Sequence, residues 1–480
     1  MERIYHSSSN QSYYYPTTLN YVTTSSDEDK PPKNRVNTVV NNDFYAENLD
    51  QIYATYPLFF QNSTTINIPQ NIKRHIERKI PKNYLNKIDK NKIYAVEKCL
   101  LFISNLTSTI FFDDKWKSLS SKILDEQFKK GKDNTFNYTY IVEALKYKSN
   151  STDSIIQTKK NKLGNDTYQE GITCKSYSFT DTFYNNNLVK YTITNPEIIA
   201  KRNKFIYSQI AKATDNIIAT NLLKLYPRID LPTECELKAE ANRLIKENHR
   251  NKKGKLLTKL NNHSKNYFKD ASERSFVEEN IKAFKFYTDI SYMIPTIGDS
   301  KSGGRVVDSF TLMPSWIRRL IKIDGESIVE VDFKAFHPNI AMSIYGGSKK
   351  YLTHSQVAED SNTDVAVVKI EHLSYFNKEV RDLKRSLLYS YYNESEIVMN
   401  ETIIKEKQMS VKGHKITSMR MFAKEVEIMT ECIRQLNSKR IYVGYIYDAL
   451  FCKKSDAKIV EQIMNKVVLQ FGVYTIASLG

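Results

Sequence analysis

The chain has 480 residues, of which 41% are hydrophobic and 26% are charged, so it is long enough for several domains and at least one sizeable core. Lys and Arg number 71 against 54 Asp and Glu, which gives a formal net charge of +17. A balance this basic favours a polyanionic partner, with nucleic acid ahead of a membrane surface. No apolar run approaches the ~18 residues of a membrane-spanning helix, which excludes that class of protein and a membrane partner of that kind.

The five cysteines are odd in number, and no two of them stand at CxxC spacing. This pattern disfavours a zinc site and a disulfide framework, and it indicates thiols in a reducing compartment. The N-terminus lacks the apolar segment of a secretory signal. We therefore expect an intracellular protein, cytoplasmic or nucleoid-associated, for which a viral or mobile-element origin also fits.

The first part of the chain offers little chemistry. Residues 1–42 are polar and rich in Ser, Thr and Asn, which predicts a disordered or partner-dependent tail. Residues 43–194 are predicted to form an N-terminal domain of unknown role. Within that domain, the apolar density of residues 92–112 predicts a buried helix, and the Asn-rich turn in residues 176–194 predicts a hairpin.

Residues 195–290 are predicted to be mainly helical. Thr233 precedes an amphipathic stretch and has Glu236 at the capping-box position, which predicts the start of a helix. A basic helical arm is predicted to follow, and it suits a phosphate backbone, although a solvated charged face is the alternative. Its basic residues include Lys252, Lys253 and Lys255.

The last third of the chain is the most informative. Its apolar spacing predicts a strand, a short helix, a second helix, a long amphipathic helix and two short strands. These elements fall, in the same order, at residues 327–333, 334–346, 381–393, 416–440 and 440–452.

Two aspartates stand among apolar residues in these elements. Asp332 ends the predicted strand, and Asp448 lies where the two short strands meet. Because burying an unpaired carboxylate is costly, each needs a cation, a donor or a metal. Two carboxylates that converge from adjacent strands would hold a pair of Mg²⁺ ions about 3.5–4 Å apart for in-line phosphoryl transfer. The alternative for each is an Asp that caps the next element.

The predicted helix at 381–393 carries a second signal. Lys384 and Tyr392 are eight residues apart, which places them near one face of a continuous helix. A Lys there can meet triphosphate oxygens, and an aromatic two turns later can pack on a base or sugar. Along the chain, Asp332 comes first, a helix with Lys384 and Tyr392 follows, and a long helix then leads to Asp448. This order points to nucleotide chemistry.

Four segments of this region resemble motifs of one polymerase superfamily. VDFKAFHPNIA (331–341) looks like motif A, LKRSLLYSYYN (383–393) like motif B and GYIYDALFC (444–452) like motif C. GGRVVDSFTLMP (303–314) is similar to the segment whose Arg approaches the primer terminus. Together they resemble the palm and fingers of family A DNA polymerases and the related phage-type single-subunit RNA polymerases, and motif B is similar to the RNA version.

The resemblance implies an α+β fold: a right-hand polymerase with a small antiparallel palm sheet, helical fingers and a helical thumb. Residues 195–290 would be the thumb-like region, and residues 291–480 would be the palm with inserted fingers. The N-terminal region would bind template or a replication-protein partner.

The resemblance also implies catalytic roles. Asp332 and Asp448 would bind both Mg²⁺ ions, and the backbone carbonyl of Phe333 would be a further ligand. Lys384 would neutralise the leaving pyrophosphate and donate a proton to it. Rate enhancement would come from positioning and charge neutralisation, without a covalent intermediate.

Further residues would bind nucleotide and nucleic acid. Arg381 and Arg385 would contact the nucleotide, Tyr392 would stack at the nascent base pair, and Arg305 would contact the primer or minor groove. His337 stands five residues after Asp332, where family A DNA polymerases carry a Glu that helps exclude a 2′-hydroxyl. It therefore favours deoxynucleotides, and the alternative is a helix-start His that bonds a backbone carbonyl.

The sequence departs from the family pattern at four further positions. Tyr447 replaces the usual His before the second Asp, and Ala449 stands where the DNA enzymes often have Glu. Asn393 replaces a Gly after the motif B Tyr, and Arg381 stands three residues before Lys384 where the family usually has four.

We therefore expect a DNA polymerase that extends a primer with dNTPs by two-metal catalysis. Its partners would be a primer–template, nucleoside triphosphates and a replication protein. An RNA polymerase or primase of the same superfamily is one alternative. A catalytically inactive nucleic-acid-binding palm protein and a basic structural protein with chance motif matches are the others.

Overall fold

The computed structural model describes residues 51–111, 114–128, 138–168, 174–184, 187–251, 253–260, 273–289 and 292–480. The predicted tail, 1–42, and Lys252 lie outside the described residues. The described chain forms two compact units, one within residues 63–203 and one made of residues 51–62 and 204–480. Helix α9 (Pro196–Thr214) contributes residues to both.

The first unit is built around helix α5 (Lys92–Ser104), in which nine consecutive residues, 95–103, are buried. The predicted buried helix is thus confirmed. Its other helices are α3 (Ile72–Lys79), α4 (Lys82–Ile88), α6 (Ser121–Phe128), α7 (Thr139–Leu145) and α8 (Asp181–Tyr184). Its strands are β1 (Thr65–Pro69), β2 (Lys117–Leu119), β3 (Ile156–Thr158), β4 (Lys175–Phe179) and β5 (Leu188–Thr192).

The predicted hairpin in residues 176–194 is wrong. Both strands exist, but β4 pairs with β2 and β3, whereas β5 pairs with β1 more than 100 residues away in sequence. The local pattern of β-branched and aromatic residues marked the strands correctly, and long-range packing chose their partners.

The second unit is centred on a six-stranded sheet with the order β13–β14–β12–β11–β6, to which β15 adds on β12. Every pairing in this sheet is antiparallel. Its strands are β6 (Ile229–Asp230), β11 (Lys322–Ile323), β12 (Glu326–Phe333), β13 (Gly444–Ile446), β14 (Ala449–Lys453) and β15 (Ala477–Leu479). The mixture of helices with small, mainly antiparallel sheets agrees with the predicted α+β class.

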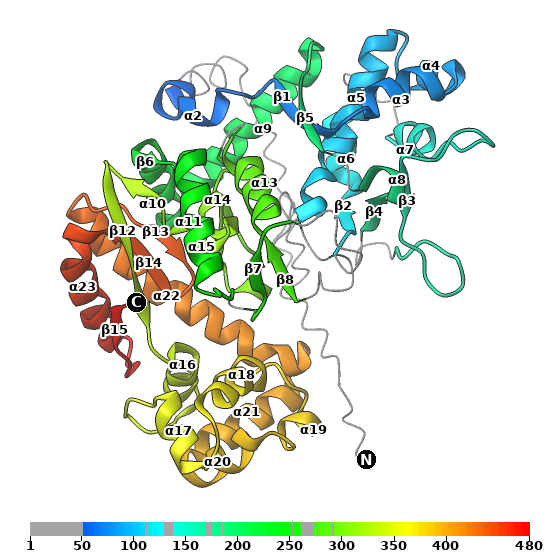
Figure 1. Ribbon diagram of the computed structural model, residues 1–480. Helices are drawn as coiled ribbons and strands as arrows, with labels where there is room; N and C mark the ends of the chain where they lie inside the picture. Colours follow the sequence, from blue (N-terminus) through cyan, green and yellow to red (C-terminus); the bar gives the residue numbers. More distant parts are fainter. Residues whose placement is uncertain are drawn as a thin grey trace, which may run out of the picture. The chain divides into compact units, whose positions relative to one another are not determined.

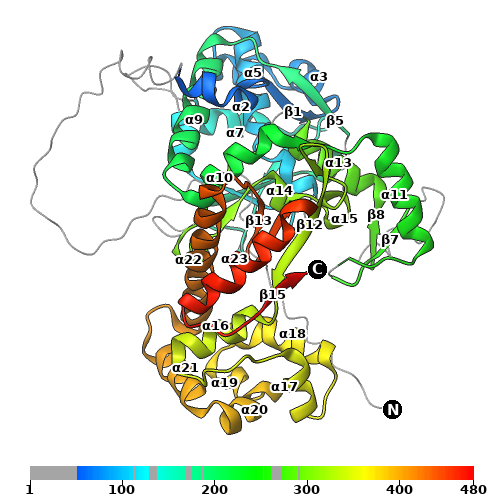
Figure 2. The same ribbon diagram turned by 90° about the vertical axis from the view of Figure 1, so that its left-hand side faces the viewer.

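Helix α23 (Ala457–Gln470) packs against this sheet, and the long helix α22 (Ile416–Ser438) packs against α23, as Figures 1 and 2 show. The apolar side chains of α22 recur at helical spacing and are buried, which confirms the predicted long amphipathic helix. The N-terminal end of α22 reaches a separate group of helices (Figure 1). That helical group contains α16 (Phe336–Tyr345), α17 (His354–Asp360), α18 (Val365–Tyr375), α19 (Val380–Leu383), α20 (Leu387–Ser395) and α21 (Ile397–Met409).

The residues before β11 supply the rest of the second unit. Thr233 caps α11 (Glu234–Lys246), and Glu236 completes the capping box as predicted. The remaining elements are α2 (Pro57–Phe60), α10 (Ile217–Leu225), β7 (Leu256–Thr258), β8 (Arg274–Phe276), α13 (Val277–Thr288), β9 (Thr296–Ile297), β10 (Val306–Val307), α14 (Ser309–Leu312) and α15 (Ser315–Arg318). The thumb and palm roles of residues 195–290 and 291–480 stay predictions.

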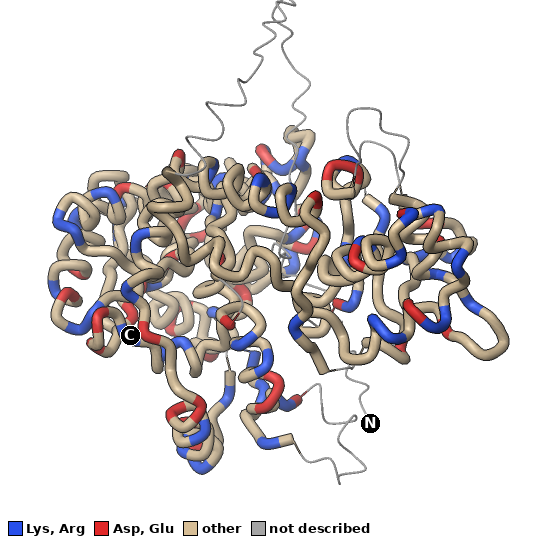
Figure 3. The backbone as a smooth tube through the Cα atoms, turned by 90° about the horizontal axis from the view of Figure 1, so that it is seen from above, with Lys and Arg blue, Asp and Glu red and all other residues tan. Residues whose placement is uncertain are grey.

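Charge is spread over both units. Figure 3 shows Lys and Arg interspersed with Asp and Glu along the described chain. Among the helices of the described residues, none has the length and hydropathy needed to cross a bilayer.

Candidate active site

The fold brings Asp332, on β12, next to Asp448, which lies in the turn between β13 and β14. Asp332 is opposite Ala449 in the β12–β14 ladder, so Asp448 is the residue next to its direct partner. The backbone N–H of Phe333 lies 3.4 Å from the carbonyl oxygen of Asp448, which ties the two segments together. Directly paired residues in such a ladder have Cα atoms about 4.5–5.5 Å apart. The backbones of Asp332 and Asp448 are thus close together, and the convergence of their carboxylates stays a prediction.

The backbone beside both acids is unusual. Tyr447, just before Asp448, has a φ of 56°, and Ala335, three residues after Asp332, has a φ of 46°. Left-handed backbone is uncommon for residues with a Cβ, and such strain gathers at functional sites. At Tyr447 it forms the tight turn between β13 and β14, and Asp448 is the second residue of that turn.

An arginine, a glutamate and a histidine meet beside Asp448. Arg305 donates from Nε and Nη2 to the two carboxylate oxygens of Glu425, both at 2.7 Å. His337 Nε2 lies 2.8 Å from Glu425 Oε2 and 3.2 Å from Arg305 Nη2. Glu425 is fully buried on α22, so the pair is a desolvated, bidentate ion pair.

Aromatic rings enclose the arginine. The guanidinium carbon of Arg305 is 3.8 Å from the ring centroid of Phe422 and 4.4 Å from that of Tyr447. A flat cation between two ring faces is attracted by both. Tyr447 therefore forms one wall of the arginine site.

The charges in this cluster shift one another's pKa. Burial alone would raise the pKa of Glu425, but Arg305 and His337 outweigh burial and lower that pKa to about 2. Burial lowers the pKa of Arg305, and Glu425 more than compensates, so it lies above its ordinary value. For Asp448, burial and the charge of Glu425 raise the pKa, whereas His337 and Arg305 oppose them. Asp448 thus sits where added positive charge would be favourable.

The loop that carries Arg305 is anchored on both sides. Gly303 has a φ of 65°, and a Cβ there would come within 2.4 Å of the backbone of Phe422 and Ala423, so glycine is required. After Arg305, Asp308 is fully buried. It accepts hydrogen bonds from Tyr226 and Thr311. These contacts fix where the arginine enters the site.

The predicted helix at 381–393 is broken, so Lys384 and Tyr392 do not share one helix face. Helix α19 ends at Leu383, and α20 begins at Leu387. Ser386 caps α20 because its hydroxyl accepts from the backbone N–H of Leu388 at 3.3 Å. Ser386 favours the start of a new helix at this point, and this preference outweighs the helical spacing of the apolar residues on both sides of it.

Tyr392 lies in the core of the helical group, and its predicted stacking on a base pair is not supported by this position. Its ring is fully buried, and its hydroxyl is 2.6 Å from His372 Nε2. Burial raises the pKa of Tyr392 well above its ordinary value. Burial, with the neighbouring His354, also lowers the pKa of His372 to about 3. The pair is a structural link between α18 and α20.

The other predicted residues fall into two groups. Arg381, Lys384 and Arg385 are exposed around the turn between α19 and α20, where the two arginines lie 3.4 and 3.8 Å from Asp382. Phe333 is buried and stacks on Phe336 with ring centroids 4.4 Å apart.

The basic arm differs from its prediction. After α11 ends at Lys246, Asn251 Oδ1 accepts from the backbone N–H groups of Lys253 and Lys255 at 2.9 and 3.0 Å. The chain then enters β7, so this stretch is a turn and a strand where a helix was predicted. Lys253 is exposed and Lys255 is half-buried.

Sequence reasoning missed Glu425. It lies on the apolar face of α22, in register with the buried residues Met421, Ile428, Met429 and Cys432. A lone acid in an apolar helical stripe needs a buried cation, and this signal was present in the sequence. The partner was not identifiable, because Arg305 is 120 residues earlier in the chain.

The donor set of the two aspartates suits Mg²⁺. Within the described residues, no group of three or more His, Cys, Asp and Glu side chains is arranged to hold a metal ion. Mg²⁺ commonly binds through one or two carboxylates and completes its octahedron with waters and phosphates. Asp332 and Asp448 supply two hard carboxylates, and the raised pKa of Asp448 marks an anion that a cation would stabilise.

Comparisons with known proteins find little similarity in sequence. No protein-family model and no curated protein matches the sequence. Among solved structures, the chain is similar to the POL domain of Pol1 from M. smegmatis, in a complex with DNA primer-template and dNTP. The identity is 11% and the TM-score is 0.31, over 57% of this chain and 65% of that chain. The match thus spans less than two thirds of that chain.

Proposed function

We propose that this protein is a template-directed nucleotidyltransferase, and that it extends a DNA primer with dNTPs. The observation that supports the proposal is the position of Asp332 on β12 beside Asp448, which lies in the left-handed turn between β13 and β14 of the same antiparallel sheet. The sheet with α22 and α23 would be the palm, the helical group α16–α21 would be the fingers, and the region of α11 to α13 would be the thumb.

In the proposed reaction, the 3′-hydroxyl of the primer attacks the α-phosphorus of a dNTP, a P–O bond forms, and pyrophosphate leaves. Asp332 and Asp448 would hold two Mg²⁺ ions, with the carbonyl of Phe333 as a further ligand. Bound Mg²⁺ would supply Lewis acidity and neutralise phosphate charge. Lys384, exposed at the turn before α20, would contact the triphosphate and give the leaving pyrophosphate a proton.

His337 and Arg305 would face the reacting sugar and the primer end. His337 is bonded to Glu425, which fixes its ring, and it is 26% exposed, so the ring presents one edge to the surface. A fixed imidazole below the sugar would clash with a 2′-hydroxyl. This supports dNTPs ahead of NTPs, and Glu425 would act as the positioning residue for that selection.

The test is primer extension on a labelled DNA primer–template with Mg²⁺, with dNTPs and NTPs supplied separately. Wild type is expected to extend with dNTPs, and Asp332→Asn and Asp448→Asn are expected to lose extension while they keep the wild-type unfolding midpoint. Asp456→Asn, just past β14, is the matched control and should extend normally.

Three outcomes would count against the proposal. Extension that survives in both aspartate variants would remove the catalytic role of these acids. Extension with NTPs alone would replace DNA synthesis with RNA synthesis by the same site. A folded wild type that binds primer–template but never extends it, with either nucleotide set and with Mg²⁺ or Mn²⁺, would favour a binding protein.

A further inference from the structure

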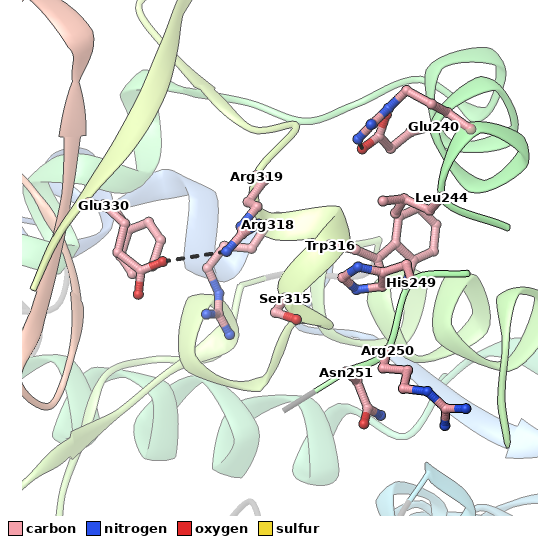
Figure 4. A pocket seen from close by; sticks show the side chains of 12 residues that line it. Glu240, Leu244, His249, Arg250, Asn251, Ser315, Trp316, Arg318, Arg319 and Glu330 are labelled. Atoms are coloured by element: carbon pink, nitrogen blue, oxygen red, sulfur yellow. Dashed lines mark hydrogen bonds and ion pairs between the residues drawn. The ribbon is translucent and has the colours of Figure 1, made fainter. Parts of the chain in front are cut away.

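The second unit contains a pocket that the proposed reaction does not use. It is a cavity of about 220 Å³ between α11 and the following turn on one side and α15 with strands β12 and β14 on the other (Figure 4). A single water needs only roughly 10–15 Å³ of such space, so the pocket has room for a larger group. Four arginines and two glutamates line it, together with His249 and Trp316.

Two nitrogens in its wall lack a hydrogen-bond partner among the described residues. They are Nε2 of His249 and Nε1 of Trp316, and both atoms are buried. The Trp316 side chain is 5% exposed, so its N–H has no bulk water to replace a partner. An indole N–H can only donate, and leaving it unsatisfied costs free energy. Both rings line the pocket, so a small rotation of either ring would offer its nitrogen to a ligand there.

The arginines at its rim add to this donor capacity. Arg250 donates from Nη1 to the carbonyl of Gly254 at 2.7 Å, and the rest of its fork has no acceptor among the described residues. Arg319 is 70% exposed and lies 4.0 Å from Glu330. In Figure 4 the side chains of Trp316 and His249 lie between those of Arg319 and Arg250.

The other charged groups of the pocket are already engaged. Glu240 accepts from Arg243 at 2.6 and 2.8 Å. Arg318 donates to the carbonyls of Phe310, Thr311 and Met313. The remaining capacity is therefore that of Arg250, an indole and an imidazole, together with Arg319, whose one ion pair is the long 4.0 Å contact with Glu330. These groups together suit an acceptor-rich anion.

We propose that this pocket binds a phosphate group, with Arg250, Arg319 and the N–H of Trp316 as its donors. Such a group has two sources: a free nucleotide or phosphate, and the backbone of a bound strand. Glu330 and Asp332 lie on the same face of β12, about 7 Å apart at the usual rise of a strand. A DNA strand whose end lies at Asp332 could therefore reach the pocket with its backbone. Only this second source, the backbone of a bound nucleic acid, depends on the proposed function.

The chain offers a direct optical test, because it has two tryptophans. In a Trp116→Phe background, Trp316 is the sole tryptophan, and its emission reports on the pocket. Inorganic phosphate, thymidine 5′-monophosphate and a short DNA duplex are titrated separately, against chloride at the same ionic strength. We expect saturable changes in emission with at least one phosphate-bearing probe and none with chloride.

The arms of the titration separate the two sources. A response to phosphate and to the monophosphate identifies a free ligand, whereas a response to the duplex alone identifies the strand backbone. Arg250→Gln and Arg319→Gln, both exposed positions that should leave the fold intact, should each weaken binding at least ~10-fold. Trp316→Phe, followed by calorimetry with the strongest probe, tests the indole N–H itself.

A folded protein whose Trp316 emission ignores all three probes would overturn the proposal, as would wild-type affinity in both arginine variants. Asp332→Asn separates this proposal from the proposed function. The variant should lose primer extension and keep the emission response, so a failure of either idea can be seen without the other.

Discussion

Arg305 and Glu425 are 120 residues apart in the chain and form a buried, bidentate ion pair with both N–O distances at 2.7 Å. The pair joins the loop after Gly303 to the middle of α22, and His337 binds to the same carboxylate. It stands beside Asp448, whose pKa it influences from both sides, because Glu425 raises that pKa and Arg305 lowers it. The ion pair thus holds the loop after Gly303 and the middle of α22 together beside Asp448.

Loss of Glu425 should change how stability depends on pH. Its pKa is lowered from 4.5 to about 2 in the folded chain, so its contribution is complete above pH 4.5 and is lost as pH falls towards 2. That contribution is about 3 kcal/mol. Urea unfolding of Glu425→Gln should therefore show a flatter pH profile than wild type in this window.

Glu427→Gln is the control for this series, because Glu427 is exposed on the same helix and pairs with Lys424 at 3.0 Å. It should keep the wild-type pH profile. An equal slope for wild type and Glu425→Gln between pH 2 and 4.5 would show that the ion pair adds no pH-dependent stability.

Two neighbouring glycines should respond differently to alanine. At Gly304 φ is 80° and a Cβ would meet nothing within 4 Å, so Gly304→Ala should cost only the backbone strain of about 1–2 kcal/mol. At Gly303 the same strain is joined by a contact of 2.4 Å with the backbone of Phe422, which must move. Chemical denaturation should rank Gly303→Ala clearly below Gly304→Ala, and equal losses would mean that the loop relaxes freely.

Tyr392→Phe tests whether the ring supports the fold or contacts nucleotide. Removal of its hydroxyl leaves His372 Nε2 without its 2.6 Å partner, which should lower the unfolding free energy by about 1–3 kcal/mol. Tyr389→Phe, half-buried on the same helix, should change it by less than about 0.5 kcal/mol. An unchanged stability together with a raised KM for dNTPs in Tyr392→Phe would restore the stacking role.

Lys384→Ala examines the exposed turn between α19 and α20. If this residue meets the triphosphate, its loss should reduce kcat/KM for dNTPs by roughly 10–100-fold, because a charge-assisted bond to phosphate is removed. Lys405→Ala, exposed on α21 of the same helical group, should have no such effect. Steady-state incorporation of one nucleotide measures both, and equal values for the two variants would exclude Lys384 from the site.

Much of the sheet was predictable because its signals are local. The alternation that ends at Asp332, the short strands around Tyr447 and the apolar period of α22 each follow from a few neighbouring residues, and β12, β13, β14 and α22 confirm them. The sequence also identified Asp332 and Asp448, whose backbones lie side by side where β12 meets the turn between β13 and β14.

The predictions that failed concern residues whose contacts come from distant parts of the chain. The continuity of the helix from Lys384 to Tyr392 was broken by the Ser386 cap, and the side chain of Tyr392 is held by His372 from another helix. Glu425 was visible as an acid in an apolar stripe, but only the folded chain brings Arg305 to it. Local periodicity cannot report such contacts, because they are decided by tertiary packing.

The central claim is that Asp332 and Asp448 act together on one pair of metal ions. Single-turnover nucleotide incorporation in Mg²⁺ by wild type, Asp332→Asn, Asp448→Asn and the double variant tests it most directly. Residues that act as a unit are not additive, so the double variant should lose no more rate than either single variant. Losses that multiply in the double variant, or substantial rates in either single variant, would contradict a shared site.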